Sequence, residues 1–124
     1  MKRLVIKSWL LLFYCDCVLR FRDFKRLINV VRSEEVHSLA TMDKTSEELC
    51  HAIDVACVFY FKPVLCLQRS AATAILLRRH GWKAQMVLAV QILPFSSHAW
   101  VEIEGCVIND KPYMPEIFQV LERC

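Results

Sequence analysis

Apolar residues recur along the first part of the chain at the three- and four-residue steps of an amphipathic helix. The pattern is clearest in the second half of residues 1–32, where lysines and arginines separate the apolar positions. These positions are Val18, Leu19, Phe21, Phe24, Leu27 and Ile28. We expect a helix here that packs on the rest of the domain. Its basic and apolar character would also suit a helix that binds a partner protein or lies on a membrane surface.

A polar stretch, residues 33–44, separates this helix from the next and predicts a loop or a short helix. His37 in this stretch has no partner pattern, so we expect a solvated histidine. The second helix begins at Thr45 or Ser46, either of which would cap it, with acidic residues in its first turn. Pro63 ends the segment. The apolar face of this helix comprises Leu49, Ile53, Ala56, Cys57 and Tyr60.

The third predicted helix, Val64 to His80, follows directly and carries Cys66 in its first turn. Its last turn is basic and Gly81 comes next, which is the usual chemistry of a helix C-terminus. Alanines at positions 71, 72 and 74 are small enough for a sheet to approach this helix closely.

After the third helix the pattern changes from helical to extended. Three segments predict strands, namely residues 84–93, 98–104 and 106–110. The last two predict an antiparallel hairpin that turns at Gly105, and a short helix over residues 115–123 would close the chain. Helices followed by strands predict an α+β fold, in which the third helix packs on a small antiparallel sheet of about three strands.

The composition sets limits on organisation and on partners. A chain of 124 residues suits one domain with a real core and is too short for two ordinary ones. We therefore expect a single unit, residues 1–124, with a helical N-terminal part over 1–62 and the core of the domain over 63–124. The hydrophobic content of 56% excludes a disordered chain. The net charge of +3, without aromatic residues interleaved among the basic ones, predicts no nucleic-acid partner.

An apolar run near the N-terminus, Trp9 to Cys15, follows three basic residues, as the start of a signal peptide would. Asp16 interrupts the pattern, and no small-residue cleavage site follows. The run is also too short to span a bilayer. We therefore expect a cytoplasmic protein without membrane contact.

Seven cysteines are scattered along the chain without a C-x-x-C pair. Because no convincing secretion signal precedes them, we expect reduced thiols, most of them packed in the core, rather than a disulfide framework. A zinc site can be imagined from Cys15, Cys17, Cys50 and His51, but this spacing fits no common zinc finger. We expect a surface position for His51, no metal and no other cofactor.

Three residues could together perform nucleophilic catalysis. Cys66 lies at a helix N-terminus, where unpaired N–H groups and the helix dipole would favour the reactive thiolate and could hold an oxyanion. His98 opens a strand as a candidate base, and Asp110 ends the next strand as a candidate acid that orients the imidazole. Each of them alone is more often structural, but their order is more specific than any one member. A second oxyanion donor could come from Gln68, Gln85 or Gln91.

The register of the predicted hairpin decides whether His98 and Asp110 can meet. A two-residue turn at Gly105 would direct their side chains to opposite faces of the sheet, because side chains alternate along a strand. A three-residue connection or a bulge would place Trp100 opposite Asp110, with His98 on the same face. We therefore predict a bulged or three-residue turn over residues 104–106.

Three segments together resemble the lasso-peptide leader peptidase family, the transglutaminase-like cysteine proteases of bacterial lasso-peptide biosynthesis. They are C-L-Q-R-S-A-A-T-A-I-L-L-R-R-H-G, P-F-S-S-H-A-W-V-E and V-I-N-D. The resemblance covers about Val64 to Tyr113, with a looser likeness in the N-terminal segment. The combined motif is specific, whereas H-A-W-V-E alone occurs across transglutaminase-like folds. The family implies a transglutaminase-like, papain-like core.

The resemblance also implies an activity and partners. Cys66 matches the family's nucleophile, His98 its base and Asp110 its orienting acid. The reaction would be hydrolysis of the leader–core bond in a ribosomally made precursor peptide, whose core then passes to a separate lasso cyclase. The chain is too short to hold a leader-binding domain as well, so it resembles the split form that works with a separate leader-recognition protein. Arg69 also matches a family position, and we expect a buried ion pair there.

The chain departs from the family pattern at one point, and two alternative functions stay open. The N-terminal helix lacks the Pro-Phe break expected near Arg20 to Phe24. The same acyl-enzyme could pass its acyl group to an amine, as a transglutaminase does, or the chain could be a non-catalytic peptide-binding subunit that keeps the fold. The intact set of Cys66, His98 and Asp110 favours the peptidase.

Overall fold

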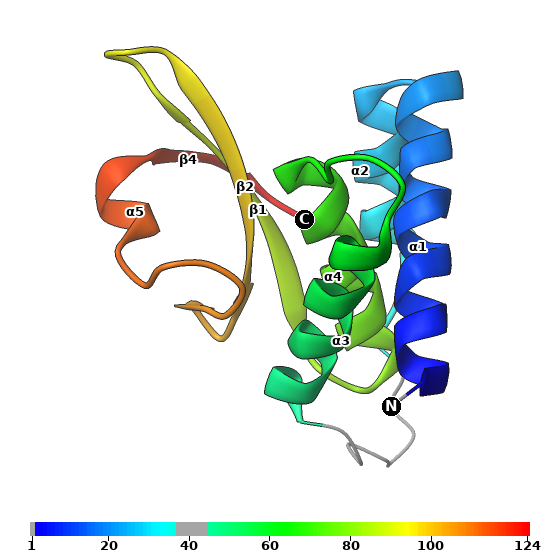
Figure 1. Ribbon diagram of the computed structural model, residues 1–124. Coiled ribbons are helices and arrows are strands. Elements are labelled where there is room, and N and C mark those ends of the chain that lie inside the picture. Colours follow the sequence, from blue (N-terminus) through cyan, green and yellow to red (C-terminus); the bar gives the residue numbers. More distant parts are fainter. Residues whose placement is uncertain (1, 37–44) are drawn as a thin grey trace.

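The computed structural model describes residues 2–36 and 45–124, so residues 37–44, with the predicted solvated His37, lie outside the described part. A layer of helices covers one face of a four-stranded sheet, and a short helix with the segment before it lies on the other face (Figure 1). The helices are α1 (Lys2–Phe21), α2 (Phe24–Ser33), α3 (Ser46–Phe59), α4 (Cys66–Arg79) and α5 (Met114–Ile117). The strands are β1 (Ala84–Gln91), β2 (Ser96–Ile103), β3 (Cys106–Val107) and β4 (Gln119–Arg123).

The predicted first helix is in fact two helices. α1 ends at Phe21 and α2 begins at Phe24, because Asp23 between them adopts an extended backbone and caps α2. Its carboxylate accepts a hydrogen bond from the Arg26 N–H at 2.8 Å. The chain therefore breaks near the position where the family pattern has Pro-Phe, but it does so with an N-cap aspartate.

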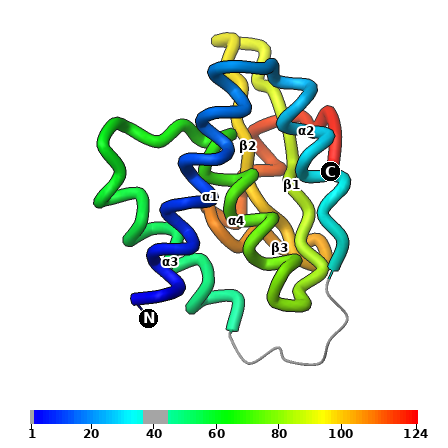
Figure 2. The backbone as a smooth tube through the Cα atoms, turned by 90° about the vertical axis from the view of Figure 1, so that its right-hand side faces the viewer, coloured from blue at the N-terminus to red at the C-terminus, as the bar shows by residue number. Residues whose placement is uncertain are grey.

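The second and third helices agree with their prediction. Thr45 caps α3 by accepting a hydrogen bond from the Glu48 N–H at 3.1 Å. α4 ends in the predicted glycine: Gly81 has φ +89°, and the N–H of Trp82 bonds back to the carbonyl of Leu77 at 3.0 Å. Every residue from 70 to 78 is buried, because α1 and α3 cover α4 on one side and the sheet covers it on the other (Figure 2).

The sheet has the strand order β3-β2-β1-β4 and is antiparallel throughout. The α+β prediction is confirmed, but the sheet has four strands, because residues 119–123 form β4 where a helix was predicted. α5 is a single turn, after which Val120 and Glu122 are half-buried and their neighbours are exposed. This alternation suits an edge strand, and pairing with β1 satisfies backbone groups that would otherwise be open at that edge.

The turn between β2 and β3 differs from its prediction. Ile103 pairs with Cys106, so Glu104 and Gly105 form a two-residue turn, with φ values of +52° and +79°. Positive φ at both central residues is the geometry that matches the right-handed twist of the two strands. The predicted three-residue or bulged connection is therefore wrong. β3 is also shorter than predicted, since it ends at Val107.

Two apolar clusters lie on the two faces of the sheet. The larger fills the space between the helices and the face that carries Met86, Leu88 and Ala99. The smaller contains Val87, Ala89, Trp100 and Met114, on the face that α5 covers. Among the described residues, no helix combines the length and the apolar character needed to cross a membrane.

Candidate active site

Cys66 is the first residue of α4, so it lies in the first turn as predicted, although the helix begins two residues later than the predicted start at Val64. Leu65 precedes it with an extended backbone and provides no side-chain cap, so the N–H groups of the first turn are not taken up by a capping side chain. The Cys66 side chain is half-buried. A thiol in this position lies close to the positive end of the helix dipole and to potential oxyanion donors.

Contacts with α1 hold the start of α4 in place. The Gln68 side chain is buried and donates a hydrogen bond to the Leu12 carbonyl at 2.9 Å. In the preceding loop, the Tyr60 hydroxyl donates to Asp16 at 2.7 Å, and Lys62 forms an ion pair with the other Asp16 oxygen at 2.9 Å. Gln68 is therefore occupied by a structural contact and is not placed as an oxyanion donor.

His98 and Asp110 lie together, as proposed from the sequence. Nε2 of His98 is 2.5 Å from Oδ2 of Asp110, and Oδ1 of the same carboxylate accepts the Lys111 N–H at 2.8 Å. Both side chains are about three-quarters covered, with 27% and 24% of their surface exposed. The imidazole also stacks on Phe118, with the ring centroids 5.5 Å apart. These contacts fix the orientation of the ring.

His98 and Asp110 meet in spite of the tight turn because the backbone stops pairing with β2 before it reaches Asp110. The last strand-like bond runs from the Ile108 N–H to the Val101 carbonyl, at 3.0 Å. The Asn109 side chain then accepts the Val101 N–H at 2.7 Å, in place of a backbone carbonyl. Strand alternation no longer applies at Asp110, so its carboxylate can turn toward His98. Sequence reasoning missed Asn109, although N-D-K-P is typical of a turn and indicates an earlier strand end.

Cys66 and His98 line the same small cavity, of about 140 Å³. They approach it from different sides, because His98 pairs with Ala89 and shares its face of the sheet, whereas α4 packs on the opposite face. Among the described residues, no hydrogen bond joins the Cys66 thiol to the imidazole. The structure thus contains the His98–Asp110 pair, and the contact between Cys66 and His98 stays a prediction. Catalytic hydrogen bonds often tighten only when substrate binds.

The lining of this small cavity is almost entirely apolar. Apart from Cys66 and His98, Ser97 is the one polar residue in it. The apolar residues come from α2, α4 and three strands and are Phe24, Leu67, Leu88, Ala89, Val90, Ala99 and Leu121. A dry apolar cavity of about 150 Å³ can accept a group the size of benzene. This cavity therefore has room for one apolar side chain of a peptide.

Four of the other thiols lie in surroundings that favour their protonated form. Burial raises the pKa of Cys15 to about 12 and, helped by Asp54, raises that of Cys50 to about 11. Burial also raises the pKa values of Cys57 and Cys124. These four thiols resist deprotonation near neutral pH. The expectation of reduced thiols, most of them packed in the core, agrees with the structure. All seven cysteines are free, Cys15 and Cys124 are buried in the main apolar cluster, and Cys57 and Cys66 pack against it.

Two further predicted positions can be compared with the structure. Arg69 forms the expected ion pair, with Asp54, but the pair is exposed on the helix surface rather than buried. His51 is exposed, as predicted. Within residues 2–36 and 45–124, no three His, Cys, Asp or Glu side chains gather in a way that could hold a metal ion.

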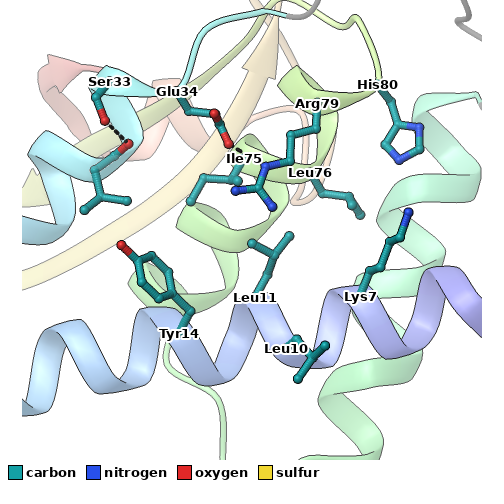
Figure 3. Close-up of a pocket in the computed structure, with 11 residues that line it drawn as sticks. Lys7, Leu10, Leu11, Tyr14, Ser33, Glu34, Ile75, Leu76, Arg79 and His80 are labelled. Carbon is teal, nitrogen blue, oxygen red and sulfur yellow. Dashed lines mark hydrogen bonds and ion pairs between the residues drawn. The ribbon is translucent and has the colours of Figure 1, made fainter.

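A second, larger cavity of about 710 Å³ lies away from this chemistry (Figure 3). It is bounded by α1, α2 and the C-terminal half of α4, so it is at the other end of α4 from Cys66. Neither Cys66, His98 nor Asp110 lines it. Its volume alone therefore does not make it the catalytic site.

Comparisons with known proteins identify a family for this chain. The family model of the transglutaminase-like superfamily matches residues 10–123, which is nearly the whole chain. A stretch of 56 residues is 41% identical to the "Microcin J25-processing protein McjB" of Escherichia coli. That stretch is 45% of this chain and only 27% of the length of the relative. No solved structure gives a significant match.

Proposed function

Because the chain belongs to the transglutaminase-like superfamily, we propose that it is a cysteine peptidase that removes the leader from a ribosomally made lasso-peptide precursor. The observation that carries this proposal is the His98–Asp110 pair next to a cavity lined by Cys66, at the start of a helix. The resemblance to lasso-peptide leader peptidases and the similarity to a protein named for microcin processing support the choice of substrate.

In the proposed mechanism, Asp110 sets the tautomer of His98. Its carboxylate accepts a hydrogen bond from the Nε2–H group of His98, which leaves Nδ1 as the basic nitrogen of the ring. Nδ1 takes the proton of the Cys66 thiol, and the thiolate attacks the carbonyl carbon of the leader–core bond. N–H groups at the start of α4 hold the oxyanion of the tetrahedral intermediate.

The second half of the reaction regenerates the thiol. The His98 imidazolium returns its proton to the leaving amine, which is the new N-terminus of the core peptide, and the leader stays attached to Cys66 as a thioester. His98 then removes a proton from water, and the resulting hydroxide attacks the thioester carbonyl. The leader leaves as a carboxylic acid that ionises in solution, and the His98 imidazolium returns its proton to the Cys66 sulfur. The first step requires Nδ1 to lie within hydrogen-bond reach of Sγ. Because His98 lies on the face of the sheet opposite to α4, this contact requires the start of β2 or the start of α4 to move, and we propose that the bound peptide drives that movement.

The proposal includes partners and a location. A separate leader-recognition protein would present the precursor, and a lasso cyclase would take the freed core. Since the precursor is made on ribosomes, the reaction would occur in the bacterial cytoplasm. The small apolar cavity beside Cys66 would receive one apolar side chain of the peptide near the cleaved bond.

The test is mass spectrometry of the precursor after incubation with this chain and its leader-recognition partner. Cys66→Ala, His98→Ala and Asp110→Ala should each abolish cleavage or lower its rate by about a hundredfold or more. Cys106→Ala is the matched control, because Cys106 is an exposed thiol outside the cavity, and its activity should equal that of the wild type. Full cleavage by Cys66→Ala would refute the peptidase.

One observation favours a second candidate function. Because no hydrogen bond joins Cys66 to His98 among the described residues, the chain could be a peptide-binding subunit that retains the fold without turnover. Such a subunit would bind the precursor equally well as wild type and as Cys66→Ala, and neither form would yield a cleaved product. The reactivity of the thiol distinguishes the two functions.

A further inference from the structure

α1 carries a second apolar face that the other described elements leave about half exposed. Ile6, Leu10, Phe13 and Tyr14 are between 43% and 59% exposed, and they recur at the three- and four-residue steps of one helix face. The opposite face of α1 is buried against α3 and α4 through Leu4, Leu11, Leu12, Cys15 and Val18. Single exposed apolar residues are ordinary, but a contiguous stripe of them marks an interaction site.

The stripe adjoins the larger cavity, so the surface has a concave part. Leu10 and Tyr14 belong to both the stripe and the cavity lining. The floor includes the buried Leu11, Ile75 and Leu76. Figure 3 shows Lys7 and Tyr14 rising from α1 toward α4 and α2. A volume of about 710 Å³ is within the range of ordinary binding pockets, and is large enough for several side chains of a partner.

The charges around this surface are mainly positive. Lys2, Arg3 and Lys7 are exposed on the first two turns of α1. The only acidic residue of α1 is Asp16, which is bound to Tyr60 and Lys62. Across the cavity, Arg79 is exposed and pairs with Glu34, with 2.5 Å between Nε and Oε1. A partner with acidic residues would therefore be attracted, and a second copy of this chain would bring the same basic helix.

We propose that the α1 stripe and the adjoining groove bind an α-helix of another protein. That helix has apolar anchors at i, i+3, i+4 and i+7 and acidic residues beside them. A groove between helices accepts a helix, since no strand edge is available there for strand addition. A flat bilayer surface would contact the stripe but would not reach the floor at Leu11, Ile75 and Leu76. The surface lies at the other end of α4 from Cys66, so the proposal holds with or without catalysis.

The test uses a fluorescein-labelled synthetic helix with leucines at the anchor spacing and glutamates beside them. Titration with the full chain, followed by fluorescence anisotropy, should show saturable binding, and a scrambled peptide of the same composition should not bind. Leu10→Asp should weaken binding about tenfold or more. Lys7→Glu should weaken it most at low salt, because exposed charges are screened as salt rises.

Two matched control variants lie on the other side of the sheet. Ile117→Asp on α5 and Lys111→Glu before it repeat the same changes at exposed positions, and should leave binding unchanged. Equal binding of the scrambled peptide, or no effect of Leu10→Asp, would overturn the proposal. The proposal would also be overturned if the chain bound anionic phosphatidylserine vesicles and the peptide did not compete for that binding. It would likewise be overturned if light scattering showed a dimer that Leu10→Asp dissociates. Those results would assign the surface to a membrane or to self-association.

Discussion

The seven thiols of this chain occupy different environments, and these differences should appear in their reactivity. Cys15, Cys50, Cys57 and Cys124 have pKa values raised by burial, so they should react slowly with iodoacetamide at neutral pH. If the proposed mechanism holds, Cys66 should be alkylated first, and its rate should depend on the ionisation of His98. Peptide mapping by mass spectrometry across about pH 5 to 9 measures both.

A variant and a control separate catalysis from simple exposure. His98→Ala should slow the labelling of Cys66 near neutral pH, while the labelling of the exposed Cys106 should not change. Uniform labelling of the accessible thiols, with no effect of His98→Ala, would favour the non-catalytic binding subunit over the peptidase.

The sequence could predict the reactive side chains but not the contacts that hold them. Cys66, His98 and Asp110 stand out because their types and order match a known chemistry. Asn109 does not stand out, and Gln68 stands out only as one of three possible oxyanion donors, because any Asn or Gln can accept or donate. Only the folded chain shows that they meet Val101 and Leu12. A hydrogen bond between residues 56 apart leaves no local signal in a single sequence.

Helices were predicted better than turns because their signals are local. The cap at Thr45, the position of Cys66 in a first helical turn and the glycine stop at Gly81 all depend on a few neighbouring residues. The hairpin register depends on whether Glu104 adopts a positive φ, which a glutamate seldom does. β4 depends on an open edge of β1, which is a tertiary feature.

Substitutions at the two positions of the two-residue turn should change the free energy of unfolding in opposite directions. Gly105→Ala should lower the free energy of unfolding by about 1 kcal/mol, because alanine resists the φ of +79° although no atom lies within 4 Å of the added methyl group. Glu104→Asn should raise it by a few tenths of a kcal/mol to about 1 kcal/mol, because asparagine tolerates a positive φ. Urea unfolding of both variants measures this. If Glu104→Asn destabilised the protein, the turn would have another geometry.

The link between α1 and the loop before Cys66 should depend on pH. Although partial burial opposes it, hydrogen bonds from Lys62 and Tyr60 lower the pKa of Asp16, and burial together with Asp16 raises the pKa of Tyr60. A carboxyl group with a lowered folded pKa stabilises the protein above its unfolded value, and this stabilisation is lost as the pH falls through the folded value. The loss should therefore occur below pH 3.8.

Urea unfolding of Asp16→Asn and the wild type at several pH values tests this sign. The variant should be less stable by a constant amount between about pH 5 and 7, and the difference should shrink below about pH 4. Asp23→Asn is a useful control, because Asn also caps helices and Asp23 has no ion pair among those that the structure describes. A difference that grew on acidification would mean that Asp16 is not stabilised as a carboxylate.

Across the whole molecule, the helical layer and the sheet are connected by a buried arginine. Arg78 is only 7% exposed, near the end of α4. Its guanidinium donates to the carbonyl of Ala84 at 2.8 Å, to that of Val31, and to the main-chain oxygen of Cys124 at 2.5 Å. It therefore ties together α4, α2 and both strands at the β1–β4 edge. The sequence suggested only a basic residue at a helix end.

Replacing Arg78 should weaken the fold without changing the chemistry at Cys66. Burial lowers the pKa of Arg78, yet an arginine keeps its charge and its planar set of donors. Arg78→Met would remove a buried donor from three main-chain oxygens, of which those of Val31 and Cys124 still accept backbone N–H groups of Glu34 and Met86. The free energy of unfolding should therefore fall by about 1 to 3 kcal/mol. Arg78→Lys should recover only part of this, because an ammonium group cannot reach acceptors in three directions. Arg79→Met at the exposed neighbouring position should lower the free energy of unfolding much less.

Urea unfolding measures these differences in stability. Cleavage per folded molecule should stay near the wild-type value, since Arg78 lies at the other end of α4 from Cys66. Equal stability of Arg78→Met and Arg79→Met would show that the buried hydrogen bonds do not connect the layers.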